Sequence, residues 1–465
     1  MNERLDQLLE GAAGLFDSPA DFRRVRTQLL AGLLNLGRHT VTGALTTAGL
    51  QHRDWSADYR VLQRLPVEEL YGYLQRQSLQ RTKGPWVIAV DDSATRKTGR
   101  HIPGCGWRRD PLSPPFHVNF CWGQRVLQCS AALHAPDGPA RLVPIDWTEA
   151  PLPKKPSRRA TQAEHDSYAE ARRQANINKV AVQRFAHLRT ATERSIHLIV
   201  DGRFTNRTVL RHLPEGTILI GRIRKDTKLY EVGQRQRGTG RPRRYGAAAP
   251  TPEQVRADEN IPWQSVRAFA IDGTHDFKIK ASGPLMARVC GVDAPVRVVV
   301  IAPLGYRLRN GSRILYRQPA YLLCTDADLS VESIVQEYLW RWDIEVNLRD
   351  QKSLLGVTQA QLRQPESVKR QPAAAVAAYA LLLLAAHDAY GHEGKPPSVP
   401  LPRWRRRVPP RRPTTGMLIS QLRVELWSQC LRTGSLSHFR TRTQRDHNAH
   451  KPDAHLASAV FYAHN

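Results

Sequence analysis

The first 84 residues carry apolar side chains at the three- and four-residue spacing of an amphipathic helix. The clearest run comprises Phe22, Val25, Leu29, Leu30, Leu33 and Leu34, with Arg23, Arg24 and Arg26 between its members. A second segment lies around Trp55 and Tyr59. This spacing predicts a small helical unit with a basic face. Two interpretations of that face are open: its charges are merely solvated, or they contact a polyanion.

Past residue 84 the pattern changes to short apolar runs that end on acidic side chains. Residues 86–90 precede Asp91 and Asp92, and residues 196–200 precede Asp201. Such runs are typical of buried strands. Further predicted strands are residues 116–122 and 126–133, joined by a turn at Gly123, and residues 217–223. Residues 163–188, rich in Ala, Glu, Gln and Arg and without proline, favour a helix. Together these elements predict a mixed α/β sheet.

The helical signal vanishes between residues 228 and 327, where residues 266–271, 296–301 and 320–324 predict strands of an inserted all-β unit. It returns in residues 330–355, with Asp328 or Ser330 as candidate N-caps and Gly356 as the stop signal. An apolar helix is predicted for residues 373–388 and another helix for residues 417–431. Residues 397–413 between them are rich in Arg and Pro, which predicts an extended basic linker.

Charge identifies the expected partner. The 465 residues suffice for roughly three packing units of about 150 residues. They include 69 Lys and Arg against 42 Asp and Glu, a formal net charge of +27. This excess attracts polyanions, and nucleic acid is the leading partner.

Other sequence features predict a cytoplasmic protein without a membrane span. The six cysteines form no C-x-x-C pair, which fits a reducing compartment. The N-terminal residues lack the basic and apolar regions of a signal peptide. The longest apolar run, residues 373–386, is shorter than the roughly 20 residues of a transmembrane helix and predicts a buried helix.

Candidate chemistry is concentrated in residues 338–352. At about 100° per residue, Tyr338, Arg341, Glu345 and Lys352 fall within a stripe roughly 60° wide. One helix face then presents a phenol, two cations and a carboxylate. The alternative is an ordinary surface stripe in which Glu345 pairs with Arg341 or Arg349.

The acidic residues can converge beside the predicted sheet. Asp91 or Asp92 at one strand end, Asp201 at another and Glu345 on the later helix would form a carboxylate cluster. Such a cluster is stable when divalent cations neutralise it, and hard oxygen ligands suit Mg²⁺ or Mn²⁺. Two such ions can drive an in-line phosphoryl displacement.

The spacing Tyr338-x2-Arg341-x3-Glu345-x6-Lys352, with WRW and IE around it, resembles the YREK signature of bacterial insertion-sequence transposases of the DDE type. The segments PWVIAVDD and IVDGRFTN support the resemblance, which covers roughly residues 85–390. It implies an RNase H-like fold interrupted by a β-rich insertion before the glutamate. The expected organisation is a helical, DNA-binding domain (1–84), a catalytic core in two parts (85–227 and 330–395), the insertion (228–329) and a basic C-terminal segment (396–465).

The resemblance places the catalytic, metal-binding acids on Asp91, Asp201 and Glu345, and implies that Tyr338, Arg341 and Lys352 contact DNA phosphates. Strand alternation lets only one of the neighbours Asp91 and Asp92 face the site. We favour Asp91, because in the family that the sequence resembles the first acid directly follows the apolar strand.

Several basic residues are weaker DNA-binding candidates. Arg241 and Arg243, in the sequence GRPRR, resemble a minor-groove hook, although a basic turn is the favoured interpretation. Lys97 and Arg100 could reach the DNA backbone or be solvated loop charges. The basic run Lys154, Lys155, Arg158 and Arg159 is interpreted as a solvated face.

The expected function is that of a DNA transposase using Mg²⁺ or Mn²⁺. It would bind the inverted-repeat ends of its own element as double-stranded DNA, cut there, and join the 3′-hydroxyl to target DNA. The expected working form is a homodimer in a synaptic complex. We expect it in the bacterial cytoplasm, associated with the nucleoid. Two alternatives are open: a metal-dependent nuclease on the same scaffold without strand transfer, and a non-enzymatic DNA-binding protein.

Overall fold

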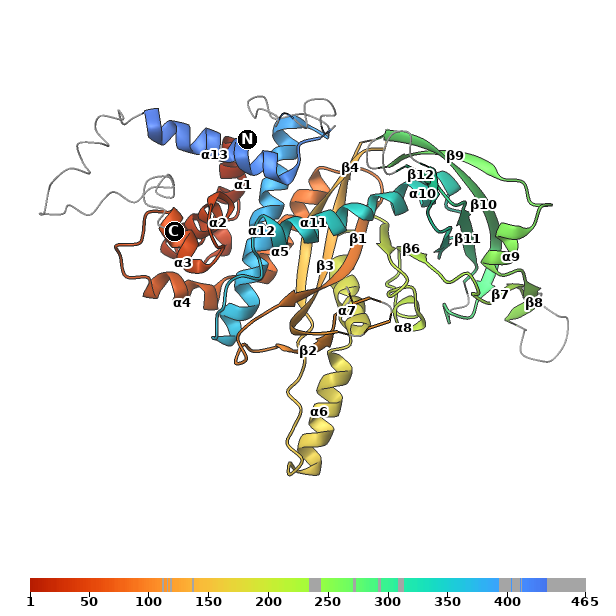
Figure 1. Cartoon of the computed structure of the whole chain (residues 1–465), viewed down its shortest axis with the longest axis horizontal. Coiled ribbons are helices and arrows are strands. Elements are labelled where there is room, and N and C mark those ends of the chain that lie inside the picture. Colours follow the sequence, from red (N-terminus) through yellow and green to blue (C-terminus); the bar gives the residue numbers. More distant parts are fainter. Residues whose placement is uncertain are drawn as a thin grey trace, which may run out of the picture.

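Three regions follow one another along the long axis of the molecule (Figure 1). A helical region lies at one end, a sheet with helices in the middle, and a strand-rich region at the other end. The computed structural model describes residues 1–110, 113–114, 116–117, 119–135, 138–233, 244–270, 273–291, 294–307, 313–392, 403, 410 and 412–432.

The helices of the described chain are α1 (Asn2–Glu10), α2 (Pro19–Leu34), α3 (Val41–Thr47), α4 (Ser56–Arg64), α5 (Val67–Gln80), α6 (Gln162–Gln174), α7 (Ile177–Arg189), α8 (Arg207–Leu210), α9 (Pro252–Ala257), α10 (Val331–Trp340), α11 (Trp342–Ser353), α12 (Pro365–Tyr390) and α13 (Thr415–Arg432), with a short 3₁₀ helix at Ala13–Leu15. The strands are β1 (Trp86–Arg96), β2 (Gly106–Arg109), β3 (Phe120–His134), β4 (Ala140–Glu149), β5 (Ile196–Val200), β6 (Thr217–Arg222), β7 (Leu229–Val232), β8 (Tyr245–Ala249), β9 (Gln264–Ala270), β10 (Gly273–Ala287), β11 (Val296–Ile301), β12 (Gly305–Tyr306), β13 (Leu315–Tyr316) and β14 (Ala320–Cys324).

The central sheet joins antiparallel and parallel strands. β3 pairs antiparallel with both β1 and β4, whereas β5 lies parallel to β1 and β6 parallel to β5. The resulting order β4-β3-β1-β5-β6 fits the RNase H-like core that the sequence resemblance implies, and the predicted mixed α/β fold class is confirmed.

Most strands of the insertion continue this sheet, while β12 and β13 form a separate two-stranded sheet. β14 pairs with β6, and β11, β10, β7 and β8 follow it, so that twelve strands form one hydrogen-bonded sheet. The insertion also contains the short helix α9, which begins with a capping box between Thr251 and Gln254. The sequence did not indicate β10 because Gly283 and Pro284 interrupt its alternation, and the register with β11 shifts between Ser282 and Leu285.

The predicted turn at Gly123 is wrong, because β3 runs straight through this residue. Gly123 instead permits a close approach of two strands. A Cβ atom at this position would lie 2.1 Å from the carbonyl oxygen of Thr95 on β1. The strand that follows β3 is β4, which the sequence pattern did not predict.

We expect Gly123→Ala to lower the free energy of unfolding by about 3 kcal/mol, because the added methyl group overlaps backbone that cannot move independently. Gly32→Ala in α2 is the matched control. Nothing lies within 4 Å of a Cβ atom there, and alanine favours a helix, so stability should rise by about 0.5–1 kcal/mol. Urea denaturation of both variants measures the difference. Equal stability of the two variants would contradict the close-approach explanation.

Two predicted helices are each divided in the structure. Residues 163–188 form α6 and α7, because Asn176 adopts an extended conformation and its side chain caps α7 by accepting the Asn178 N–H. Residues 330–355 form α10, capped by Ser330, and α11, which meet at Arg341. There the Arg341 N–H donates to the carbonyl of Tyr338, three residues back, instead of four.

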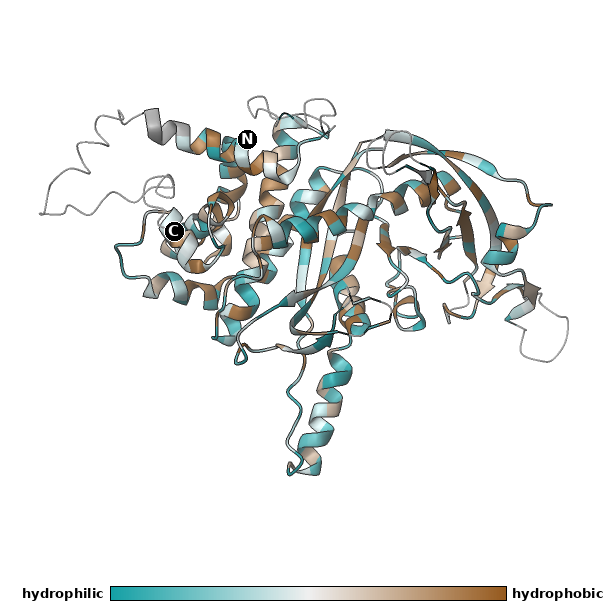
Figure 2. Cartoon of the chain, viewed as in Figure 1, coloured by the Kyte–Doolittle hydropathy of each residue, from teal (hydrophilic) through white to brown (hydrophobic). Residues whose placement is uncertain are grey.

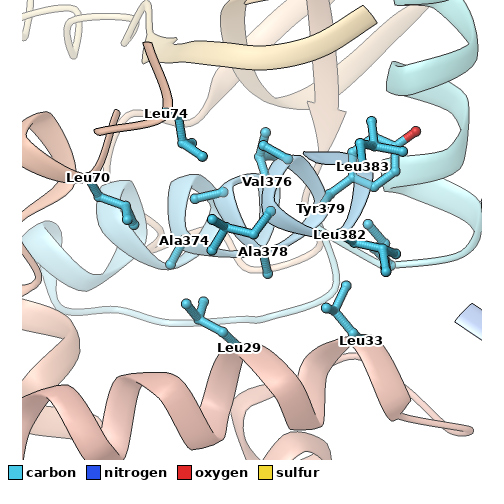
Figure 3. Close-up of a cluster of buried hydrophobic side chains, with 14 of the residues drawn as sticks. Leu29, Leu33, Leu70, Leu74, Ala374, Val376, Ala378, Tyr379, Leu382 and Leu383 are labelled. Atoms are coloured by element: carbon cyan, nitrogen blue, oxygen red, sulfur yellow. The ribbon is translucent and has the colours of Figure 1, made fainter. Parts of the chain in front are cut away.

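The helical core is centred on α12, the apolar helix that the sequence predicted. Figure 3 shows Leu29 and Leu33 of α2 and Leu70 and Leu74 of α5 around Ala374, Val376, Ala378, Tyr379, Leu382 and Leu383 of α12. By length and composition α12 could cross a bilayer, but 72% of its most apolar window is buried inside the protein. Colouring by hydropathy shows this helix largely brown where the other helices surround it (Figure 2).

Candidate active site

Asp91 and Asp201 lie level with each other on neighbouring parallel strands. In the pairing of β1 with β5, Trp86 is opposite Ile196 and Ala89 is opposite Ile199. Two residues further along each strand the same register reaches Asp91 and Asp201. The negative charge of Asp201 raises the cost of ionising Asp91. The two predicted acids therefore lie on neighbouring strands, with Asp201 just after the end of β5. The prediction that a strand ends at Asp91 is wrong, because β1 continues to Arg96 and pairs with β3 over that length.

Glu345 of α11 is linked to this edge by the guanidinium group of Arg341. Nη2 of Arg341 is 2.7 Å from Oε1 of Glu345, and Nη1 is 3.7 Å from Oδ2 of Asp91. The pairing of Glu345 with Arg341, considered from sequence as an ordinary surface pair, is thus present. It is not an isolated surface pair, because Arg341 also faces Asp91 and only 14% of its side chain is exposed.

Burial gives Asp91 unusual protonation behaviour. Its side chain is 18% exposed. Desolvation raises its pKa to about 7, and the charge of Asp201 acts in the same direction, while Arg341 opposes both effects. Asp91 in the metal-free protein is therefore poised to change its charge near neutral pH.

The raised pKa of Asp91 predicts a pH-dependent stability. The protonated carboxyl group is favoured in the folded state, so the stability from Asp91 is complete below about pH 4 and is lost as the pH rises through about 7. In EDTA, the free energy of unfolding of Asp91→Asn should equal that of wild type at pH 4. Above pH 7 it should exceed the wild-type value by up to about 4 kcal/mol. Chemical denaturation at several pH values measures this difference. A pH-independent difference would contradict the predicted shift.

Asp92 faces the opposite side of the sheet from Asp91, as the alternation of a strand requires. Its carboxylate is 2.7 Å from Nε of Arg125 on β3 and 3.2 Å from Nε of Arg203, just after β5. Two arginines thus neutralise Asp92, whereas Asp91 faces Arg341. No sequence pattern indicated this double pair, although Arg203 lies only two residues after Asp201.

Tyr338 and Lys352 lie on either side of the Arg341–Glu345 pair along the two helices. The Tyr338 ring centre is 6.0 Å from the Arg341 guanidinium carbon, and burial raises the pKa of the phenol. Lys352 donates to the hydroxyl of Ser93 at 2.5 Å, two residues beyond Asp91, and burial lowers the pKa of its ammonium group. All four side chains of the helical motif therefore contact one another or the middle of β1. Arg241 and Arg243 lie outside the described residues.

Buried polar contacts fix the two helices on the sheet. Both oxygens of Glu337 on α10 lie 2.9–3.0 Å from Nδ1 of His197 on β5. At the start of α11, Asp343 accepts the Leu142 N–H at 2.9 Å and also pairs with Arg412. These contacts hold the helices against β5 and β4, the former being the strand that delivers Asp201. No short sequence motif predicted these contacts.

The side chains of this site can be compared with those that a divalent cation requires as ligands. Among the described residues, no three His, Cys, Asp or Glu side chains are gathered closely enough to form a metal-binding group. The positive charge beside Asp91 and Glu345 is that of Arg341. Among the described residues, the hydrogen bond found at the Asp91 carboxylate is the one that its Oδ1 accepts from the Asp92 N–H, at 2.8 Å. Hard carboxylate oxygens of this kind fit Mg²⁺ or Mn²⁺.

Comparison with known proteins identifies the family of this chain. The model of the family described as DDE superfamily endonuclease matches residues 15–276, more than half of the chain. The matched segment includes Asp91 and Asp201 and ends before α10. No curated protein matches the chain. Among solved structures, the piggyBac transposase synaptic complex with hairpin DNA is similar, with a TM-score of 0.37 and 11% identity over 99% of this chain and 82% of that chain.

Proposed function

Because this chain belongs to the DDE superfamily endonucleases, we propose that it is a transposase that cuts DNA at the ends of its own mobile element and joins the freed 3′-hydroxyl to target DNA. The observation that supports this most is the level placement of Asp91 and Asp201 on parallel strands, with Glu345 connected to Asp91 through Arg341. The register of β1 with β5 also favours Asp91 over Asp92.

In this proposal, Asp91, Asp201 and Glu345 hold divalent cations. The family generally uses divalent metals, and two such ions supply activation of the attacking hydroxyl group and stabilisation of the leaving oxygen. The charge of Arg341 offsets part of the repulsion on Asp91 and Glu345 before the cations bind. The buried Glu337–His197 contact keeps α10 in place on β5 while the DNA enters.

Arg341, Lys352 and Tyr338 orient the DNA strand in this proposal. An arginine can bind a phosphate through two parallel hydrogen bonds, and a lysine provides a compact positive charge. Lys352 is held by Ser93, so its ammonium group remains two residues along β1 from Asp91. A phosphate near Lys352 would place the neighbouring phosphodiester close to the carboxylates.

The proposed partners are the inverted-repeat ends of the element and the target DNA, with two copies of the chain pairing the two ends. The formal net charge of +27 supports a partner with a phosphate backbone. Arg23 of α2, which is exposed, and the basic C-terminal segment would add affinity that depends little on sequence. Arg24 and Arg26 of the same helix are half-buried and pair with acidic side chains of the helical region. Such binding should weaken steeply as the salt concentration rises. Association with the nucleoid would follow from the same charge.

The test of the proposal is cleavage of a labelled DNA fragment that carries the flanks of the gene. Cutting at the flanks in Mg²⁺, and none in EDTA, is the expected result. Binding without cutting in either condition would overturn the catalytic proposal and leave a DNA-binding protein. Cutting at sites unrelated to the flanks would instead favour a general nuclease on the same scaffold.

A further inference from the structure

An exposed face of the β2–β3 hairpin combines aromatic rings with arginines. Trp107 pairs with Trp122 across the two strands, and Arg109 pairs with Phe120. These four side chains alternate with Arg108 and Cys121, which point inward: Arg108 donates to the Ala150 carbonyl, and Cys121 is buried. Trp107 is 56% exposed and Phe120 63% exposed. We call Arg100, Trp107, Arg109, Phe120 and Trp122 the hairpin face.

The rings of the hairpin face are held in a defined arrangement. Trp107 and Trp122 meet edge to face, with centroids 5.8 Å apart. The guanidinium carbon of Arg100 lies 4.7 Å from the Trp107 centroid and 5.2 Å from that of Trp122. Nε1 of Trp122 donates to the Gly99 carbonyl at 3.0 Å. The aromatic surface is thus fixed before any partner arrives, which reduces the ordering cost of binding.

The hairpin face lies on the same side of the sheet as Asp91. In the antiparallel pairing of β1 with β3, Asp91 is opposite Gln128 and Thr95 is opposite Gln124, so the even-numbered residues of β3 share the side of Asp91. Trp122 belongs to this set, and its carbonyl accepts the Lys97 N–H. Six residues of strand separate Asp91 from Lys97, about 20 Å. That length corresponds to about six base pairs of B-DNA.

We propose that the hairpin face binds unpaired bases of the DNA strand that passes through the active site. Arginines beside exposed rings suit a strand with negative phosphates and stacking bases, and a base can stack on a ring only when its own face is not covered by its neighbours. The cutting of a DNA end, on which this inference rests, creates strands whose bases can come apart. The hairpin face thus contributes a preference for frayed or single-stranded ends over intact duplex.

The test compares two labelled duplexes of equal sequence, one blunt and one with a six-nucleotide single-stranded extension. Binding to the full chain is measured by fluorescence anisotropy in EDTA, so that no strand is cut. We expect Trp107→Ala and Phe120→Ala each to weaken binding of the extended duplex about tenfold, with less than a twofold change for the blunt duplex. Trp107→Phe should restore most of the affinity. Tyr316→Ala removes an aromatic side chain that is 69% exposed in the insertion, and serves as the matched control.

The outcomes separate this inference from the proposed function. Equal weakening on both duplexes, or none, would overturn the base-stacking role while Mg²⁺-dependent cleavage could stand unaffected. A Trp107→Ala variant that binds both DNAs normally but changes its sedimentation would identify the hairpin face as a protein contact, and would also overturn the inference. Selective weakening in a protein that cuts no DNA would instead leave the stacking site and remove the proposed reaction.

Discussion

Asp91→Asn is expected to reduce metal-dependent DNA cleavage at least about a thousandfold, whereas Asp92→Asn should retain activity within about tenfold of wild type. The reason is the alternation of β1. Asp91 faces Arg341 and lies level with Asp201, while Asp92 lies on the other side between Arg125 and Arg203. Removing one charged metal ligand removes several kcal/mol of transition-state stabilisation.

Initial cleavage rates in Mg²⁺, measured on the flank-bearing fragment, check this pair of variants. They control for each other, because each exchanges one carboxylate for an amide at neighbouring positions. Asp92→Asn should lose thermal stability because two arginines lose their ionic partner. The reverse order, with Asp92→Asn inactive while still folded and Asp91→Asn active, would assign the first catalytic acid to Asp92.

Glu345→Gln is expected to reduce cleavage by a similar factor without a large loss of stability. The side chain is 39% exposed and pairs with Arg341 at the four-residue spacing of a helix, an interaction that contributes only about 0.5 kcal/mol. Any loss of activity would therefore come from the missing carboxylate and not from unfolding. DNA affinity in EDTA should remain close to that of wild type.

Glu332→Gln is the matched control, because Glu332 is an exposed glutamate in the first turn of α10. Its cleavage rate should equal that of wild type. Parallel measurements of cleavage rate, melting temperature and DNA affinity distinguish the two glutamates. A Glu345→Gln protein that cuts DNA at the wild-type rate would remove Glu345 from the catalytic group.

The positions of the candidate acids could be predicted because each is marked locally. An apolar run followed by an acid indicated both Asp91 and Asp201. The strand does end before Asp201, whereas β1 continues through Asp91 to Arg96 because its polar second half still pairs with β3. The spacing around Glu345 supplied the third member. The structure brings Asp91 and Asp201 level and links Glu345 to Asp91 through Arg341, while the catalytic roles of the three acids stay predictions.

The contacts that the sequence could not predict connect residues far apart in the chain. Arg125 is 33 residues from Asp92, and Arg412 is 69 residues from Asp343. No local period relates such pairs, since the fold alone makes them neighbours. Gly123 was misinterpreted for a related reason. A glycine that permits a turn and a glycine that permits two backbones to approach look the same in a single sequence.

The hydrophobic pattern of the sequence also did not predict the helix break at Arg341. The residues on both sides favour a helix, and the switch to a three-residue hydrogen bond changes no residue type. It does affect the site, because the stripe of Tyr338, Arg341, Glu345 and Lys352 is carried by two short helices and not by one. The buried Glu337–His197 contact and the Asp343 contacts hold these two pieces separately.

Joining of DNA strands, beyond cutting them, distinguishes the proposed transposase from a nuclease. The most direct test supplies a pre-cut, 5′-labelled element end with a free 3′-hydroxyl, a supercoiled plasmid as target, and Mg²⁺. We expect the wild-type protein to join the label covalently to the plasmid, and no joining with Glu345→Gln or with a 3′-dideoxy end. Efficient cutting of uncut flanks without any joined product would rule out a transposase and identify the protein as a nuclease that does not transfer strands.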